Sequence, residues 1–217
     1  MCGRFALYSS FQAIKDYADL LNDIDEIDSN YNIAPGQEIS IIINKNQQNI
    51  LKSYKWGLIP FWAKDENIGY KLINTRGETI SEKPSFKYAF QQRRCLIPAN
   101  GFYEWRKKDK QPFYITLQDR ELFSFAGIWE IWKSPAGKQI FFCSIITTSA
   151  NKKLSNIHHR MPVILKKDDE KTWLKENNNN ILQHLLTSYP IAELLLNPVS
   201  QNVNSVKNNY PELIEAI

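Results

Sequence analysis

The feature that most constrains the fold is a succession of six strand-like runs in the 217-residue chain. Each run is rich in Ile, Phe, Tyr, Trp or Val and lies between Gly, Pro, Asp or Asn; they cover residues 39–44, 49–60, 112–119, 122–133, 138–148 and 161–167. Between the fourth and fifth runs, "SPAGKQ" indicates a hairpin. No regular helical crossover alternates with these runs. They therefore predict an α+β fold with a curled, mainly antiparallel, barrel-like β core.

Helices are expected only at the periphery of this core. Residues 11–22 place Phe11, Ile14, Tyr17, Ala18 and Leu21 at helical spacing, and Ser9 or Ser10 can cap that helix. Residues 23–37 are predicted to form a loop that ends at Pro35-Gly36, and residues 168–176 and 180–187 to form short helices. Since no linker or repeat divides the chain, we expect one domain over residues 1–217.

The composition is that of an ordinary globular protein, with 43% hydrophobic and 23% charged residues. We find no run of about 18 apolar residues and no secretory signal, so we expect a cytoplasmic protein with no membrane partner. The chain has three widely spaced cysteines and no CxxC pair: Cys2, Cys95 and Cys143. This argues against a disulfide framework or a structural zinc site. The net charge of +4 permits a nucleic-acid partner without predicting one.

The opening "MCGRF" places a cysteine directly after the initiator methionine. Because Cys2 is small, an aminopeptidase can remove Met1, which would leave a thiol and a free α-amine on neighbouring carbons. No internal cysteine has this 1,2-aminothiol chemistry.

Three further segments carry more polar chemistry than strand packing requires: "NTRGET" (74–79), "RRCLIPANGFYEW" (93–105) and "IHHRMP" (157–162). In the first, alternation places Asn74, Arg76 and Glu78 on one side of a strand that follows "YKLI", although a solvated strand face is an equally simple explanation. In the second, Glu104 lies between two aromatic residues, which predicts partial desolvation and a raised pKa if it is not on a wet strand face.

The third segment holds two of the three histidines. His158 and His159 are either functional or structural, and on a strand their side chains would point to opposite faces, so no zinc site is expected there. His184 is interpreted as structural. The chain also lacks GxGxxG, Walker and GxSxG motifs, so we expect neither a cofactor nor a serine hydrolase site.

Eight segments resemble, in order, the SOS-response-associated peptidase (SRAP) family of abasic-site-processing proteins. They are "MCGRF", "YNIAPGQ", "WGLIPFWAKD", "INTRGET", "RRCLIPANGFYEW", "FAGIWE", "TTSAN" and "IHHRMPVIL", and "NPVSQNVNSVKNN" resembles the family's C-terminal block. The resemblance implies a protein that cross-links itself through its N-terminal cysteine to abasic sites in single-stranded DNA.

Carried over motif by motif, the resemblance implies four catalytic residues: Cys2, Asn74, Glu104 and His158. It also implies contacts to the DNA backbone from Arg4 and Arg76. A wedge and loop near the lesion would come from Asn32, Pro35 and Trp62. Single-stranded DNA is the expected partner, with no metal or other cofactor, and we expect a monomer that joins the nucleoid when DNA is damaged.

Two departures from the family pattern concern the neighbours of these residues. Thr75 and Gly77 flank Arg76 where the family commonly has Ala before the arginine and Ala or Ser after it, and Gly77 is expected to loosen the strand that aims Arg76. His159 stands where many members have Asp.

Two other functions remain open from the residues alone. Glutamine amidotransferases with an N-terminal nucleophile also begin Met-Cys-Gly, although the chain has no matching glutamine-binding motif. A non-catalytic binder of damaged DNA would use Cys2 only for packing. The resemblance adds autoproteolytic loss of Met1 or a leader, and a weak lyase activity, as side reactions.

Overall fold

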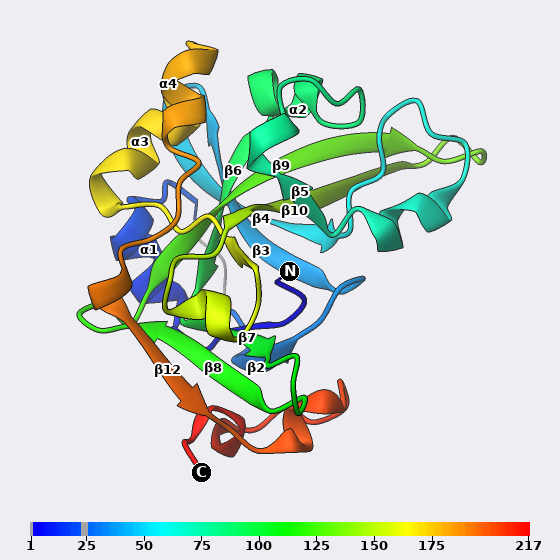
Figure 1. Ribbon diagram of the computed structural model, residues 1–217. Coiled ribbons are helices and arrows are strands. Elements are labelled where there is room, and N and C mark those ends of the chain that lie inside the picture. Colours follow the sequence, from blue (N-terminus) through cyan, green and yellow to red (C-terminus); the bar gives the residue numbers. More distant parts are fainter. Residues whose placement is uncertain (1, 23–25) are drawn as a thin grey trace.

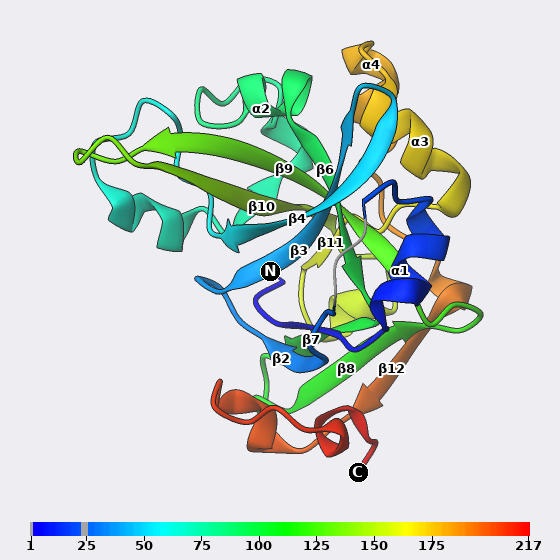
Figure 2. The same ribbon diagram turned by 180° about the vertical axis from the view of Figure 1, so that it is seen from behind.

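The computed structural model describes residues 2–22 and 26–217, which form the predicted mixed α+β fold (Figures 1 and 2). Its strands are β1 (Phe5–Leu7), β2 (Asn30–Ile33), β3 (Glu38–Lys45), β4 (Gln48–Trp56), β5 (Asn74–Arg76), β6 (Arg94–Ala99), β7 (Gly101–Trp105), β8 (Pro112–Leu117), β9 (Phe123–Lys133), β10 (Gln139–Ser149), β11 (Arg160–Pro162) and β12 (Leu194–Pro198). Its helices are α1 (Phe11–Ala18), α2 (Lys87–Gln92), α3 (Lys167–Lys175) and α4 (Asn179–His184), with short 3₁₀ turns η1 (Glu66–Lys71), η2 (Gly77–Thr79), η3 (Leu154–Asn156), η4 (Ile191–Glu193), η5 (Gln201–Asn204) and η6 (Pro211–Ile214).

Five strands close into the predicted barrel. The pairings run from β10 to β4, β3, β6 and β9, and β9 pairs again with β10. All are antiparallel except β10 with β4, where Phe142 lies opposite Lys55. The long β9–β10 hairpin projects from the barrel in both views (Figures 1 and 2). Closure buries apolar side chains from every barrel strand in one cluster, which supplies most of the core.

A second sheet, in the order β12-β8-β7-β1-β2, lies beside the barrel. Its strand β7 follows β6 after the single residue Asn100, whose Oδ1 accepts hydrogen bonds from the backbone N–H groups of Tyr8 and Ser9 at 2.8 and 3.1 Å. This buried amide therefore fixes the N-terminal segment to the junction of the two sheets. The C-terminal segment covers the other side of the second sheet through Val199, Val203 and Leu213.

Several predicted elements are shorter than expected. The helix predicted over 11–22 is capped by Ser10 as proposed, but it ends at Ala18 because Asp19 takes a left-handed conformation. The run 49–60 ends as β4 at Trp56, because Gly57 has φ +133° and a Cβ there would lie 2.8 Å from the backbone oxygen of Gly69.

Other predictions are wrong. The loop over 23–37 contains β2 at Asn30–Ile33, and part of it, residues 23–25, lies outside the described residues. The strand expected before Asn74 is the 3₁₀ turn η1, and β5 ends at Arg76, so Glu78 lies on η2 instead of continuing an alternation. The strand predicted over 161–167 is only β11, and Lys167 already begins α3.

Candidate active site

Cys2 and Asn74 meet although 72 residues separate them in the sequence. Strand β1 pairs with β7, with Phe5 opposite Phe102, and Tyr103 N donates to Arg4 O at 2.9 Å. This antiparallel register brings Cys2 alongside the end of β7. Strand β5 pairs with β10 and places Asn74 at its start, where Asn74 Nδ2 donates to Cys2 O at 2.7 Å. The Asn74 amide therefore holds the backbone of the cysteine directly.

The Cys2 thiol is completely buried, and Sγ lies 3.9 Å from Arg4 O. Burial raises the pKa of this thiol far above its ordinary value, and the nearby negative charge of Glu104 raises it further. The resting thiol is therefore neutral, and Glu104 acts on it electrostatically.

Glu104 lies on β7 with only 3% of its surface exposed. Its neighbour Tyr103 is fully buried, so both faces of β7 are covered at this point. Burial raises the pKa of the Glu104 carboxyl from 4.5 to about 7. The prediction of a desolvated carboxyl is confirmed, and a group with this pKa can both donate and accept protons near neutral pH.

His158 lies in the loop between η3 and β11, half-buried beside the backbone of Arg160. Its Nδ1 is 3.1 Å from Arg160 N and 3.2 Å from Arg160 O, which fixes the ring through that nitrogen. Burial lowers the pKa of His158 to about 4, and the nearby positive charge of Lys107 contributes to the shift. His158 is therefore neutral at pH 7.

Arg160 is in turn held by a contact that the sequence did not reveal. Its Nη1 and Nη2 pair with the two oxygens of Glu78 at 2.5 and 2.9 Å, and Nη2 also donates to Thr147 O at 2.7 Å. Since a bidentate arginine–carboxylate pair is directional, Glu78 and Thr147 orient the segment that carries His158. The signal available in the sequence was the charge of Glu78, which the wrong strand prediction assigned to the face of Asn74.

His158 and His159 do not point to opposite faces as expected. They lie in a loop instead of a strand, and their ring centroids are 4.5 Å apart. Within residues 2–22 and 26–217, however, no group of three His, Cys, Asp or Glu side chains is arranged to hold a metal ion.

Arg4 and Asn32, two predicted DNA contacts, bind each other and the C-terminal segment. Arg4 Nη1 donates to Asn32 Oδ1 at 2.6 Å and to Val203 O at 2.9 Å. Asn32 is buried, and its Nδ2 donates to Val203 O, Ser205 O and Asn208 O at 3.3, 2.9 and 2.8 Å. Both side chains therefore anchor the tail in this structure, and their contact with DNA stays a prediction.

The remaining predicted DNA contacts are more accessible. Arg76 is exposed at the end of β5, Pro35 is half-buried in the turn after β2, and Trp62 is 50% exposed. Contrary to expectation, Gly77 packs tightly, since a Cβ there would lie 3.2 Å from Leu186 Cβ, and its carbonyl accepts from Gln183 Nε2 at 2.8 Å. The backbone that carries Arg76 is therefore well fixed.

Two exposed aromatic residues near Trp62 were not predicted. Phe61 is 56% exposed and makes an edge contact with Tyr88, with ring centroids 6.1 Å apart. The turn that carries Phe61 and Trp62 is fixed to the β9–β10 hairpin, because Trp132 Nε1 donates to Ala63 O at 2.7 Å. Alternation could not reveal these residues, since both lie outside strands.

Comparisons with known proteins show the family of the chain. The family model described as SOS response associated peptidase (SRAP) matches residues 1–206. "Abasic site processing protein YoqW" of Bacillus subtilis (strain 168) is 48% identical over 223 residues, covering all of both chains. "Abasic site processing protein HMCES" of Xenopus tropicalis is 30% identical over 228 residues, covering 90% of this chain and 68% of that protein.

The fold also matches a solved structure along its whole length. The crystal structure of a protein from Bacteroides thetaiotaomicron superposes with a TM-score of 0.91 at 27% identity, covering 100% of each chain. The chain belongs to the SOS response associated peptidase (SRAP) family.

Proposed function

We propose that the protein processes abasic sites in single-stranded DNA by forming a covalent thiazolidine through Cys2 once Met1 has been removed. The observation that carries this proposal is the contact of Asn74 Nδ2 with Cys2 O, 2.7 Å, beside the buried carboxyl of Glu104. Relatives that align over the whole chain are named abasic site processing proteins.

The α-amine of Cys2 is the first nucleophile in this proposal. An abasic site opens to an aldehyde at the first sugar carbon, and a free α-amine with a pKa of roughly 7.7–8.0 is partly neutral at pH 7. The amine adds to the aldehyde, and an acid protonates the departing hydroxyl, so that loss of one water leaves a protonated Schiff base. The thiol then adds to its carbon, with sulfur bonding to carbon and the thiol proton returning to the carboxylate that the acid became, which closes the five-membered ring.

The state of the thiol supports this order of steps. Burial keeps the Cys2 thiol neutral at rest, so the α-amine is the better first nucleophile, and the thiol adds later to the more electrophilic Schiff base. The amidotransferase alternative, in which the amine serves only as a base, is disfavoured because the chain has no matching glutamine-binding motif.

Two side chains would serve the proton transfers, and a third would orient the cysteine. Glu104 gives a proton to the departing water and takes one from the thiol, as its pKa of about 7 permits. His158, held through Nδ1, acts through Nε2 at the sugar hydroxyl during ring opening, and Asn74 orients the cysteine backbone.

The DNA would be held mainly by its backbone. Arg76 and Arg4 are assigned to phosphates, and Trp62, with Asn32 and Pro35, to the region of the lesion. Because a Schiff base beside a 3′ phosphate invites β-elimination, we expect weak lyase activity that ring closure suppresses. We also propose that Met1 is lost without general proteolysis of other proteins, and that the protein acts as a monomer on damaged nucleoid DNA.

Intact mass spectrometry of the protein mixed with a single-stranded oligonucleotide carrying one abasic site tests this function. The expected product has the combined mass of the Met1-free protein and the oligonucleotide, less one water. A Schiff base has the same mass, so the sample is also treated with borohydride. This reagent adds two hydrogens to a Schiff base and leaves a thiazolidine unchanged.

Two variants complete the test. Cys2→Ala keeps an α-amine and should give only a borohydride-trapped adduct, whereas Cys2→Ser should give a less stable ring. A non-catalytic binder would form no covalent product in any variant, and stable adduct formation by Cys2→Ala at the wild-type yield would rule out the thiazolidine.

A further inference from the structure

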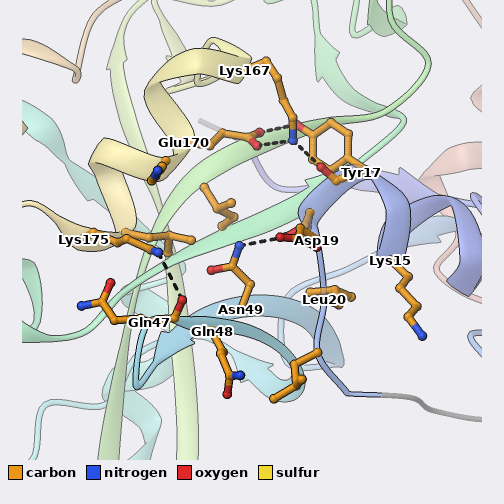
Figure 3. Close-up of a pocket in the computed structure, with 15 residues that line it drawn as sticks. Lys15, Tyr17, Asp19, Leu20, Gln47, Gln48, Asn49, Lys167, Glu170 and Lys175 are labelled. Atoms are coloured by element: carbon orange, nitrogen blue, oxygen red, sulfur yellow. Dashed lines mark hydrogen bonds and ion pairs between the residues drawn. The ribbon is translucent and has the colours of Figure 1, made fainter.

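A cavity lies between α1, α3 and the turn that joins β3 to β4 (Figure 3). Its volume is about 660 Å³, which is in the range of known ligand pockets. The described residues that line it include none of the four predicted catalytic residues. It is therefore a separate feature of the molecule.

The cavity and the candidate active site lie at opposite ends of β4. Gln48, at the start of β4, lines the cavity, whereas Trp56, at its end, donates through Nε1 to the carbonyl of Ile73 at 2.9 Å, next to Asn74. Eight steps along a strand span roughly 26 Å. A ligand in the cavity and DNA at Cys2 can therefore be bound at the same time.

The charges around the cavity favour an anion. Among the described residues that line it, four are lysines, Lys15, Lys167, Lys171 and Lys175, and two are acidic, Asp19 and Glu170. Three of these lysines follow one face of α3 at intervals of four residues. The buried Glu170 carboxylate already accepts from Lys167 Nζ at 2.9 Å and from the Tyr17 hydroxyl. The described lining residues thus carry a formal net charge of +2, and Lys171 and Lys175 lie on the same face of α3.

The lining is also apolar in part. Leu20, Leu96 and Leu174 line the cavity, and Leu21 at its edge is 58% exposed. The matching ligand carries carboxylates together with a bulky apolar side chain.

The same lining disfavours nucleic acid. Tyr17 is the one aromatic residue among the described lining residues, and Lys167 Nζ covers its ring at 3.5 Å from the centroid. No arginine occurs among those residues either. A nucleotide would thus find neither a stacking surface nor a bidentate phosphate contact.

We propose that this cavity docks an acidic segment of a partner protein, with an apolar side chain inserted between α1 and α3 and its carboxylates on the lysines of α3. This goes beyond the proposed chemistry at Cys2, because it gives the protein a protein partner that does not compete with DNA.

Fluorescence anisotropy with the 217-residue chain tests the docking site. The probe is a short labelled peptide with one phenylalanine among aspartates. We expect saturable binding that weakens with salt, and much weaker binding when serine replaces the phenylalanine. Lys171→Glu/Lys175→Glu should weaken the binding of the probe about tenfold or more.

The matched control is Lys133→Glu/Lys138→Glu on the β9–β10 hairpin, which makes the same change in net charge at exposed positions. It should leave peptide binding unchanged, and the cavity variant should form the abasic-site adduct at the wild-type rate, which separates this proposal from the proposed function. Three results would each overturn the proposal: no saturable peptide binding, equal weakening by the control, or displacement of the peptide by a lesion-free single-stranded oligonucleotide.

Discussion

Two buried glutamates, one in each sheet, differ in how the burial of the carboxyl group is compensated. Glu130 on β9 is 2% exposed, forms an ion pair with Arg93 and accepts a hydrogen bond from Ile131 N at 2.8 Å. Glu104 on β7 is 3% exposed, and there burial outweighs the favourable interactions, so the pKa of the carboxyl rises to about 7. Glu130 is ion-paired with Arg93, whereas the net effect of burial at Glu104 is a carboxyl that holds a proton near neutral pH.

The difference separates a structural carboxylate from a chemical one. Arg93 is itself fixed against the rings of Tyr88 and Trp129, with its guanidinium 4.9 and 5.5 Å from their centroids. A charge that is paired in this way is a poor proton carrier. At Glu104 the fold accepts an unfavourable ionised state, as is common at functional sites.

The largest expected effect is on the rate of adduct formation. Glu104→Gln removes the proton carrier and should slow the reaction by about 100- to 10,000-fold, which is the usual range for a general acid–base group. By microscopic reversibility it should also slow release. The measurement preforms the adduct, adds an excess of competing abasic oligonucleotide, and follows exchange over hours. Glu130→Gln is the matched control and should leave both rates unchanged in the folded protein.

If Glu104→Gln exchanges as fast as wild type, Glu104 is not the shared proton carrier. If Glu130→Gln is equally slow, the loss of rate comes from removing a buried carboxyl group in general and not from the proton that Glu104 carries.

The choice of substrate should separate the role of His158 from that of Glu104. His158→Ala is expected to slow adduct formation about 100-fold on a natural abasic site, because the sugar ring must open. An oligonucleotide with an acyclic aldehyde needs no ring opening. With that substrate His158→Ala should approach the wild-type rate, whereas Glu104→Gln stays slow. Equal defects on both substrates would contradict the assignment of His158 to the sugar hydroxyl.

The two glutamates should also differ in their effect on stability. The folded-state pKa of Glu104 is raised from 4.5 to about 7, so its contribution to stability is complete below pH 4.5 and is lost as the pH rises through 7. Above that pH the buried charge costs on the order of 3 kcal/mol. Glu104→Gln should therefore raise the free energy of unfolding at pH 9 relative to wild type and have little effect at pH 5.

Glu130→Gln should instead lower the free energy of unfolding, because it leaves Arg93 without its charge partner. Breaking a buried ion pair costs roughly 3–5 kcal/mol, and Arg93, at 22% exposure, falls near the lower limit. Urea denaturation at pH 5 and pH 9 measures both variants. A lower stability of Glu104→Gln at pH 9 would show that the carboxylate is stabilised by its surroundings after all.

The sequence revealed the barrel but not the contacts that complete the site. Long apolar runs such as 122–133 predict strands well, because a barrel strand buries its side chains over many residues. Strands β1 and β5 are three residues long and too short for any periodicity, yet they carry the approach to Cys2 and Asn74. The desolvation of Glu104 was predictable from its aromatic neighbours.

Other features depend on distant partners. Arg4 binds Val203 O across 199 residues, and Arg160 binds Glu78 across 82. No local pattern encodes such contacts. The two histidines precede the predicted strand at 161–167, and no local pattern shows that their rings lie together in a loop.

The smallest expected effect is that of Arg76 on the affinity for single-stranded DNA. It is best compared with Arg4, a charge that is bound within the protein. Arg76 is exposed, whereas the guanidinium of Arg4 is half-buried and bound to Asn32 and Val203. Arg76→Ala should weaken binding of lesion-free single-stranded DNA a few-fold, equally for all base compositions, and lower the salt slope by about 0.7, because a phosphate contact carries no base information.

Arg4→Ala should in addition lower the thermal stability, because it leaves Asn32 Oδ1 without the Arg4 donor and removes one of the two donors to Val203 O. Anisotropy titrations with two oligonucleotides of different composition across a salt series, combined with thermal unfolding of each variant, measure both effects. A loss of binding by Arg76→Ala for only one base composition would mean that Arg76 contacts bases. An unchanged salt slope would mean that the exposed arginine contacts no phosphate, and the DNA path would then have to lie away from the end of β5.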